Sequence, residues 1–339
     1  MDIAIVGTGR GSVHARWIAQ CPEFSVTAVA CAQDTEAAAE MVRTHHLHAE
    51  VTTDALSLIR HGRIDAVAIT TPTHSRHELV SEALTRGLLV MCEAPLAASR
   101  QSALKLAELA RAQDARAIVA FQLRENPALR HARQAIAEGA VGELLAIDLG
   151  LHDDAHTRTA GPGGRRERRD DDGALTELGT HAFDLVPWLT GMGLWEVSSA
   201  WTHCLQDGRS GHDAVPRNVD DIAQAELRTL GCPTRARVMV SRTGTPQSQL
   251  LVTAHGDRGV IHVRVNTADG SGLFTLYTGS RDAQQLFGPH PMNPYRRLAD
   301  DLDSGVRPVS GFDDGLAALT LVDAALGVGG TERREGRVP

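Results

Sequence analysis

The sequence predicts an α/β protein in which a parallel, doubly wound sheet is followed by an α+β domain with a large open, mostly antiparallel sheet. Short apolar runs alternate with segments of helical periodicity over the first 121 residues. After this point strand-like segments predominate, separated by turns that contain Gly, Asp and Pro. The length of 339 residues also suits two domains better than one.

The first elements set the pattern. Residues 3–6 form a continuous apolar run that breaks at Gly7, as expected of a parallel strand buried on both faces. Residues 13–19 have helical spacing and end before Pro22, and a strand follows at 25–31. The alternation continues through a helix from about residue 35, a strand at 66–70, a helix at about 75–86, a strand at 88–92, a helix at 99–112 and a strand at 117–121. Such βα repeats specify a parallel sheet with helices on both faces.

The rhythm changes after residue 121, so we expect a first domain at 1–121 and a second at 122–339. In the second domain we expect helices near 128–138 and 175–189 and a strand at 144–151. Further strands are expected near 196–202, 222–229, 235–241, 250–255, 260–264 and 273–277. Two last helices, from about 295 and at 315–326, are expected to pack back toward the first domain.

Composition excludes several classes of protein. No apolar run approaches the roughly 20 residues that span a bilayer, and the start MDIAIVGTGRGS does not resemble a signal peptide. We therefore expect a cytoplasmic protein with no membrane partner. The five cysteines are scattered without a CxxC pair, which predicts mostly buried thiols rather than disulfides or a zinc site. The net charge of −8 argues against a nucleic-acid partner.

The stretch Gly7-Thr8-Gly9-Arg10-Gly11-Ser12 lies where a dinucleotide fingerprint has to lie, after the first strand and at the start of the first helix. Gly7 permits a tight turn, and Gly9 lets the backbone approach a pyrophosphate at the helix N-terminus. Ser12 holds the third glycine position and is small enough to keep helix and strand close, while Gly11 adds local freedom. We interpret this stretch as a nucleotide site rather than a purely structural turn.

The end of the second strand leaves the choice between NAD and NADP open. After Cys31 there is no acid at the strand tip to hold the ribose hydroxyls, and Asp34 stands further on. No arginine stands there to bind a 2′-phosphate either. The expected cofactor is therefore NAD or NADP.

A second group of candidates lies on the helix expected at 175–189. Glu177, His181, Asp184 and Trp188 recur at spacings of four, three and four residues, so they share one face. Carboxylates beside an imidazole can orient a substrate hydroxyl and move its proton, because histidine changes charge near neutral pH. The same set would also suit a divalent metal, and a lone histidine is often a hydrogen-bonded core residue. We favour a catalytic function without a metal.

Four stretches form a wider pattern. They are GTGRGSVHA, with a histidine after the glycine loop; residues 65–77, with a Thr-Pro and a later histidine; Gln122-Leu-Arg-Glu-Asn-Pro, at the crossover between the expected domains; and residues 173–184. Over nearly the whole chain, this pattern resembles the Gfo/Idh/MocA oxidoreductase family. The resemblance implies a Rossmann domain, a nicotinamide cofactor, a C-terminal domain with an open sheet, and a homodimer or homotetramer formed through that sheet.

The resemblance also implies roles for single residues. Substrate contacts are implied for Asp184, Arg124 and Asn126, and proton transfer for His181 with Glu177. Cofactor contacts are implied for Gly7, Thr8, Gly9, Arg10, Gly11, Ser12, Cys31, Thr71, Pro72, Thr73, His77, Glu93 and Ala94. The substrate class that the family implies is a sugar, a polyol or another small metabolite with a hydroxyl or carbonyl group.

One departure from the family pattern concerns proton transfer. Ala94 stands where the family has a catalytic lysine, and Lys105, the only lysine, is expected on a helix surface. Glu177 corresponds to a family aspartate, and its longer side chain partly fills the room left by Ala94. Three functions stay open: an oxidoreductase in which His181 and Glu177 replace the lysine, with or without net redox change; a non-catalytic NAD(P)-binding sensor or auxiliary protein; and a reductase of imine or C=C bonds.

A long loop at 161–173 brings arginines beside three aspartates. Its arginines are Arg165, Arg166, Arg168 and Arg169. We interpret it as a solvated, partly self-neutralised loop. The alternative is a lid over an anionic substrate, since guanidinium groups suit phosphate and carboxylate.

Overall fold

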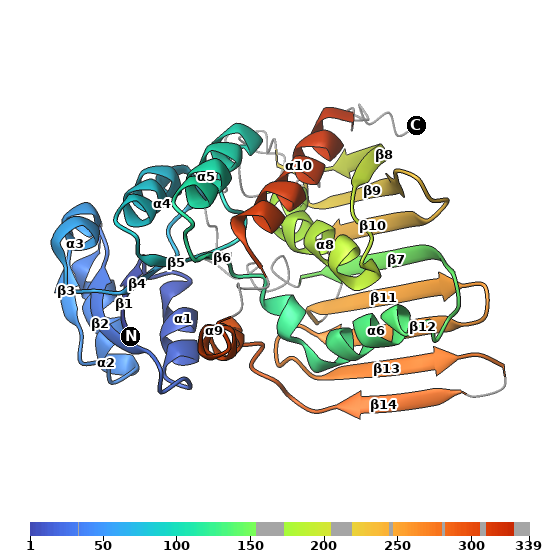
Figure 1. The fold of residues 1–339 in the computed structure, drawn as a ribbon, viewed down its shortest axis with the longest axis horizontal. Coiled ribbons are helices and arrows are strands. Elements are labelled where there is room, and N and C mark those ends of the chain that lie inside the picture. The colour runs from blue at the N-terminus through green and yellow to red at the C-terminus, as the bar shows by residue number, and fades with distance from the viewer. Residues whose placement is uncertain are drawn as a thin grey trace, which may run out of the picture. The chain divides into compact units, whose positions relative to one another are not determined.

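The computed structural model describes residues 1–32, 34–153, 173–204, 219–243, 247–279, 282–305 and 310–328. The chain divides into two compact units (Figure 1). The first unit contains residues 1–125 and 293–319, and the second contains 126–292 and 320–339. The first stretch thus runs to Glu125, a little beyond the boundary expected from the sequence, and the first unit also takes in a segment near the C-terminus.

The first unit contains a six-stranded parallel sheet in the order β3-β2-β1-β4-β5-β6. Its strands are β1 (Asp2–Val6), β2 (Ser25–Ala30), β3 (Glu50–Thr52), β4 (Ala66–Ile69), β5 (Leu89–Cys92) and β6 (Ala117–Val119). Its helices are α1 (Gly11–Ile18), α2 (Thr35–Thr44), α3 (Ala55–His61), α4 (Arg76–Thr85), α5 (Arg100–Ala112) and α9 (Pro294–Asp303), with 3₁₀ turns at Thr73–Ser75 and Gln122–Glu125. The strand order reverses between β1 and β4, and ligands of such sheets bind at the strand ends beside this switch point. The predicted doubly wound parallel sheet is confirmed.

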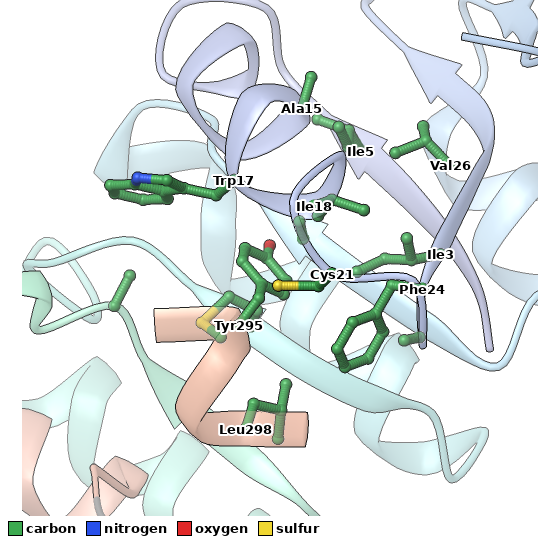
Figure 2. Close-up of a cluster of buried hydrophobic side chains, with 14 of the residues drawn as sticks. Ile3, Ile5, Ala15, Trp17, Ile18, Cys21, Phe24, Val26, Tyr295 and Leu298 are labelled. Carbon is green, nitrogen blue, oxygen red and sulfur yellow. The ribbon is translucent and has the colours of Figure 1, made fainter. Parts of the chain in front are cut away.

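The core of this unit explains the continuous apolar run of β1. Successive residues Ile3, Ala4, Ile5 and Val6 are all buried, because both faces of the sheet are covered. On one face Ile3 and Ile5 join a cluster that Tyr295, from the distant helix α9, completes (Figure 2). The same cluster includes Ala15, Trp17, Ile18, Cys21, Phe24, Val26 and Leu298.

The second unit contains an eight-stranded sheet in the order β14-β13-β12-β11-β7-β10-β9-β8. Its strands are β7 (Leu144–His152), β8 (Trp195–His203), β9 (Ile222–Thr229), β10 (Arg235–Ser241), β11 (Gln249–Gly256), β12 (Val260–Asn266), β13 (Gly272–Tyr277) and β14 (Ala283–Phe287). All neighbours are antiparallel except β7 and β10, which confirms the predicted, mostly antiparallel sheet. Helix α6 (Pro127–Ala137) packs on β12 to β14, and α8 (Ala174–Thr190) packs on β7, β9 and β10.

Three elements were not expected from the sequence. The strand β3 is short and mostly exposed at the sheet edge, and α3 follows it with a single fully buried residue, Ile59. The strand β14 is likewise an exposed edge strand. None of these segments carries the apolar run or the periodicity of a core element, because each buries little surface. The last helix, α10 (Phe312–Val328), begins in the first unit and ends in the second.

In the described part of the chain, no helix is both long and apolar enough to cross a bilayer. All five cysteines are free thiols, as predicted. Cys21 and Cys92 are buried, whereas Cys31, Cys204 and Cys232 are only partly buried, so the expectation of mostly buried thiols holds for two of the five.

Candidate functional site

The glycine loop is attached to the switch point of the parallel sheet. Gly7 has a φ of +102°, and its N–H donates to the Ala30 carbonyl at 2.8 Å. The Thr70 hydroxyl, at the end of β4, donates to the carbonyls of Val6 and Gly7 at 3.0 and 2.9 Å. A Cβ on Gly7 would lie 2.9 Å from the Thr70 Oγ1 atom, so the position requires glycine for both its φ and its space.

Gly11, rather than Ser12, provides the close approach of helix to strand. A Cβ on Gly11 would lie 3.0 Å from the Ile5 Cγ2 atom and 3.3 Å from the Thr70 Oγ1 atom. The Ser12 hydroxyl is instead hydrogen-bonded to His45 Nε2 at 2.7 Å, next to the end of α2. The assignment of this packing role to Ser12 is therefore wrong. Ser12 is the next residue along α1, so it points away from the helix face that meets β1.

The loop fits the diphosphate of a dinucleotide. A Cβ on Gly9 would meet no atom within 4 Å, so the backbone there borders open space. Helix α1 has no side-chain cap at its N-terminus, which leaves backbone N–H groups for an anionic group. In addition, the buried Thr71 Oγ1 atom at the end of β4 has no hydrogen-bonding partner among the described residues. An unpaired buried hydroxyl beside the switch point is expected where a polar ligand completes a site.

A buried network lies beside this loop. Glu93 Oε1 accepts hydrogen bonds from Arg10 Nε at 2.9 Å and from His14 Nε2 at 3.0 Å, and His14 Nδ1 lies 2.7 Å from the Tyr295 hydroxyl. Burial opposes ionisation of Glu93, but the hydrogen bond from His14 and the charge of Arg10 outweigh it and hold the Glu93 pKa well below its ordinary value. Burial and the nearby Glu93 charge raise the Tyr295 pKa well above its ordinary value. The network thus places a buried carboxylate next to the glycine loop.

Arg76 joins the ends of two strands. Its buried guanidinium donates from Nε to the Thr71 carbonyl and from Nη1 to the Glu93 carbonyl, both at 2.7 Å, and also to the Pro95 carbonyl. These bonds hold the segments after β4 and β5 together. The sequence motif included Arg76 but did not reveal this positioning role.

Some of the other predicted cofactor residues lie beside the glycine loop or Glu93, whereas others make contacts within helices and turns. Thr8 and Cys31 lie together, with Thr8 Oγ1 3.7 Å from Cys31 Sγ, and Ala94 directly follows Glu93. His77, by contrast, lies within α4 and is hydrogen-bonded through Nδ1 to the Ser102 hydroxyl of α5 at 2.8 Å. Pro72 precedes the 3₁₀ turn that starts at Thr73, and its carbonyl accepts from the Ser75 hydroxyl. Asp34 caps α2 by accepting from the Ala37 N–H at 2.8 Å.

In the second unit, helix α8 begins against an acidic residue far along the chain. Asp220 accepts from the Leu175 N–H through Oδ2 at 2.7 Å and from the Ala174 N–H through its carbonyl at 3.0 Å. A Cβ on Gly173, the N-cap residue, would lie 2.2 Å from Asp220 Oδ1. Asp220 therefore caps α8 in place of a local side chain, and glycine is required for the close approach.

The polar face of α8 has a graded exposure. Glu177, in the first turn, is ion-paired with Arg242, which directly follows β10. One turn further on, His181 is partly buried, and Asp184 is buried. Trp188 lies under the Arg133 guanidinium of α6, 5.0 Å from its ring centroid. The predicted face therefore exists, and only its first two members, Glu177 and His181, retain appreciable exposure.

The two remaining substrate candidates, Arg124 and Asn126, both make contacts within the chain. Arg124 is buried, ion-paired with Asp314 at 3.5 Å and stacked 5.4 Å from the Phe121 ring centroid. Asn126 is completely buried: Oδ1 caps α6 by accepting from the Ala128 and Leu129 N–H groups, and Nδ2 donates to the Gly270 carbonyl at 2.8 Å. Both polar side-chain atoms of Asn126 are thus hydrogen-bonded to backbone groups of the same unit.

Arg242 and Tyr295 carry no sequence signal for these contacts, because their partners lie 65 and 281 residues away. The Arg-rich loop 161–173, with Arg165, Arg166, Arg168 and Arg169, lies outside the described residues except for Gly173. No three His, Cys, Asp or Glu side chains gather as metal ligands would within the described ranges.

Comparison with known proteins matches both parts of the chain. Residues 1–121 match an oxidoreductase family described as having an NAD-binding Rossmann fold, and residues 129–262 match the GFO/IDH/MocA C-terminal domain. The chain is 25% identical to a levoglucosan dehydrogenase of Pseudarthrobacter phenanthrenivorans, over 96% of this chain and 87% of that protein. It is also 25% identical to an inositol 2-dehydrogenase of Rhizobium meliloti, over 95% of this chain and 94% of that protein. The rhizopine catabolism protein MocA of Rhizobium meliloti is 29% identical over 56% of this chain and 57% of that protein.

Solved structures share the fold. An oxidoreductase domain protein from Kribbella flavida superimposes with a TM-score of 0.83 at 21% identity, covering 96% of each chain. Levoglucosan dehydrogenase in complex with NADH and levoglucosan also has a TM-score of 0.83 at 21% identity, covering 97% of this chain and 96% of that one.

Proposed function

Because the chain belongs to the Gfo/Idh/MocA oxidoreductase family, we propose that it is an NAD-dependent dehydrogenase of a sugar, a polyol or a related hydroxyl- or carbonyl-bearing metabolite. Relatives that match along most of the chain include an inositol 2-dehydrogenase and a levoglucosan dehydrogenase, which supports this substrate class. When bound, the nicotinamide supplies hydride transfer, and the protein supplies binding, orientation and proton transfer.

The observation that carries the proposal is the face of α8 with Glu177, His181 and Asp184. Ala94 has no titratable group, and Lys105 lies exposed on α5, as predicted. Neither residue therefore takes the place of the catalytic lysine that the family resemblance implies. We assign proton transfer to a ring nitrogen of His181, which takes the proton of the substrate hydroxyl in oxidation and returns it in reduction.

Glu177 has a positioning role in this proposal. Arg242 donates to Oε2 of Glu177, so the carboxylate is held in place one helical turn from His181. A carboxylate fixed at that spacing orients the imidazole and stabilises it when it carries the proton. Asp184 and Arg124 remain proposed substrate contacts.

Ala94 favours one second candidate, a reductase of imine or conjugated C=C bonds. Such a substrate takes its proton from water or from its own acidic group, so no lysine is needed. A reductase of this kind would tolerate loss of His181, whereas the dehydrogenase would not.

The test begins with calorimetric titration of NAD⁺, NADH, NADP⁺ and NADPH. A panel of polyols, sugars, imines and enones is then followed by nicotinamide absorbance. We expect tight binding of NAD⁺ or NADH and turnover of a polyol or sugar. Turnover of imines or enones alone would favour the second candidate. Cofactor binding without any turnover would favour a sensor, and no binding would overturn the proposal.

We also propose that the chain forms a homodimer or homotetramer through the open face of its eight-stranded sheet. In support, this face carries a hollow of about 270 Å³ lined by residues including Leu251, His262, Arg264 and Leu273. Light scattering should give a multiple of the 36.3 kDa chain mass. Leu251→Glu should reduce that mass to one chain, whereas Leu326→Glu on α10 should not; an unchanged mass for the first variant would contradict the proposal.

A further inference from the structure

A continuous line of hydrogen bonds runs from α9 to the glycine loop. It begins at the Tyr295 hydroxyl, 2.7 Å from His14 Nδ1, and continues from His14 Nε2 to Glu93 Oε1 at 3.0 Å. It ends at Arg10 Nε, 2.9 Å from the same Glu93 oxygen. Tyr295 and His14 are 0% exposed and Glu93 is 3% exposed, whereas the Arg10 side chain is 47% exposed. The line therefore leads from the core to a cation at the surface of the loop.

His14 connects Glu93 to Tyr295 through its two ring nitrogens. An ionised carboxylate only accepts, so Glu93 requires a proton on His14 Nε2. The other ring nitrogen, Nδ1, is hydrogen-bonded to the Tyr295 hydroxyl. Tyr295 thus fixes the orientation of the imidazole that bonds Glu93. Figure 2 shows the Tyr295 ring inserted among core side chains of the first unit, so its hydroxyl has little freedom to move.

Arg10 is held at two points, which leaves both terminal nitrogens of its guanidinium without a polar partner among the described residues. Its Nε atom is bonded to Glu93, and its guanidinium carbon lies 5.9 Å from the centroid of the Trp17 ring. Arg10 is also the N-cap residue of α1, between Gly9 and Gly11. A guanidinium fixed in this way loses little further freedom when it binds an anion.

We propose that Tyr295, His14 and Glu93 are positioning residues that hold the Arg10 guanidinium as a preorganised contact for a phosphate of the bound dinucleotide. The inference rests on the proposed function, because it takes a nicotinamide dinucleotide as the ligand. It adds that α9, a helix that follows residues 126–292 of the second unit, contributes to the affinity of the N-terminal nucleotide loop.

Binding measurements test this without any turnover. Calorimetry gives the Kd of NADH and of ADP-ribose, which has the diphosphate but no nicotinamide. The proteins compared are the wild type, Arg10→Met, Tyr295→Phe, Glu93→Gln and the double variant Arg10→Met with Tyr295→Phe. The matched control is Tyr277→Phe, since Tyr277 is the other tyrosine of the chain and lies exposed on β13.

We expect Arg10→Met to weaken both ligands about tenfold, because a charge-assisted hydrogen bond is lost. Tyr295→Phe and Glu93→Gln should weaken both ligands by a smaller factor, about threefold, and the double variant should bind no more weakly than Arg10→Met alone. Tyr277→Phe should bind like the wild type. This non-additivity is a result that a purely structural role of Tyr295 would not produce.

Three outcomes would overturn the inference. If Arg10→Met binds ADP-ribose normally, Arg10 does not contact a phosphate. If the effects of the two single variants multiply in the double variant, Tyr295 does not act through Arg10. If the wild type binds neither ligand, the proposed function itself fails, and this result is distinct from the first two.

Discussion

Arg242 and Glu177 form an ion pair that connects the end of β10 to the first turn of α8. The Arg242 side chain is 7% exposed and the Glu177 side chain 45% exposed, so a buried cation anchors a carboxylate that reaches the surface. The pair fixes the start of the helix that carries His181.

We expect Arg242→Met to lower the free energy of unfolding by about 1–3 kcal/mol, because a buried charged hydrogen-bonding group is lost. Turnover should fall as well, since Glu177 is no longer held. The matched control is Arg237→Met on β10, whose ion pair with Asp148 is solvent-exposed and is worth at most about 1 kcal/mol. Denaturant unfolding and steady-state kinetics measure both effects. Equal stability of the two variants would contradict a structural role for the Arg242 pair.

His181→Ala should lower kcat by about 10² to 10⁴ if His181 transfers the proton. The Kd of NADH should stay unchanged, because the glycine loop lies in the other unit. His61→Ala, at an exposed histidine at the end of α3, serves as the control and should keep full activity. If His181→Ala keeps its turnover, another group transfers the proton, or the protein is the imine or C=C reductase.

Two glycines of the loop should respond differently to substitution. Gly11→Ala adds a Cβ 3.0 Å from Ile5, so we expect a loss of stability of about 1–3 kcal/mol together with weaker NADH binding. Gly9→Ala meets no neighbour within 4 Å and should leave the melting temperature unchanged while NADH binding falls. Gly193→Ala, also without a neighbour within 4 Å, should change neither quantity. Normal NADH binding by Gly9→Ala would argue against close approach of the diphosphate at this residue.

The stability contributed by Glu93 should depend on pH. Its pKa in the folded protein lies well below the ordinary value of 4.5, so the ionised carboxylate stabilises the fold above that value. This contribution is lost as the pH falls from 4.5 toward the depressed pKa. Glu93→Gln should therefore melt at a lower temperature than the wild type at pH 7, and the difference should narrow below about pH 4.5. A constant difference across this range would contradict the depressed pKa.

Several features of the fold could be predicted from local sequence alone. Apolar runs such as residues 3–6 revealed the buried parallel strands, and the spacing of Glu177, His181 and Asp184 placed them on one helix face. The edge strands β3 and β14 were missed because an exposed strand needs no apolar pattern.

The sequence by itself determined the order of the core elements and the family. Only the tertiary structure decided that Gly11 rather than Ser12 meets Ile5, that Arg242 holds Glu177, and that Tyr295 completes the network at Glu93. The physical reason is that periodicity and turn residues act over a few positions along the chain. Contacts such as that between His14 and Tyr295, 281 residues apart, depend on how whole elements pack.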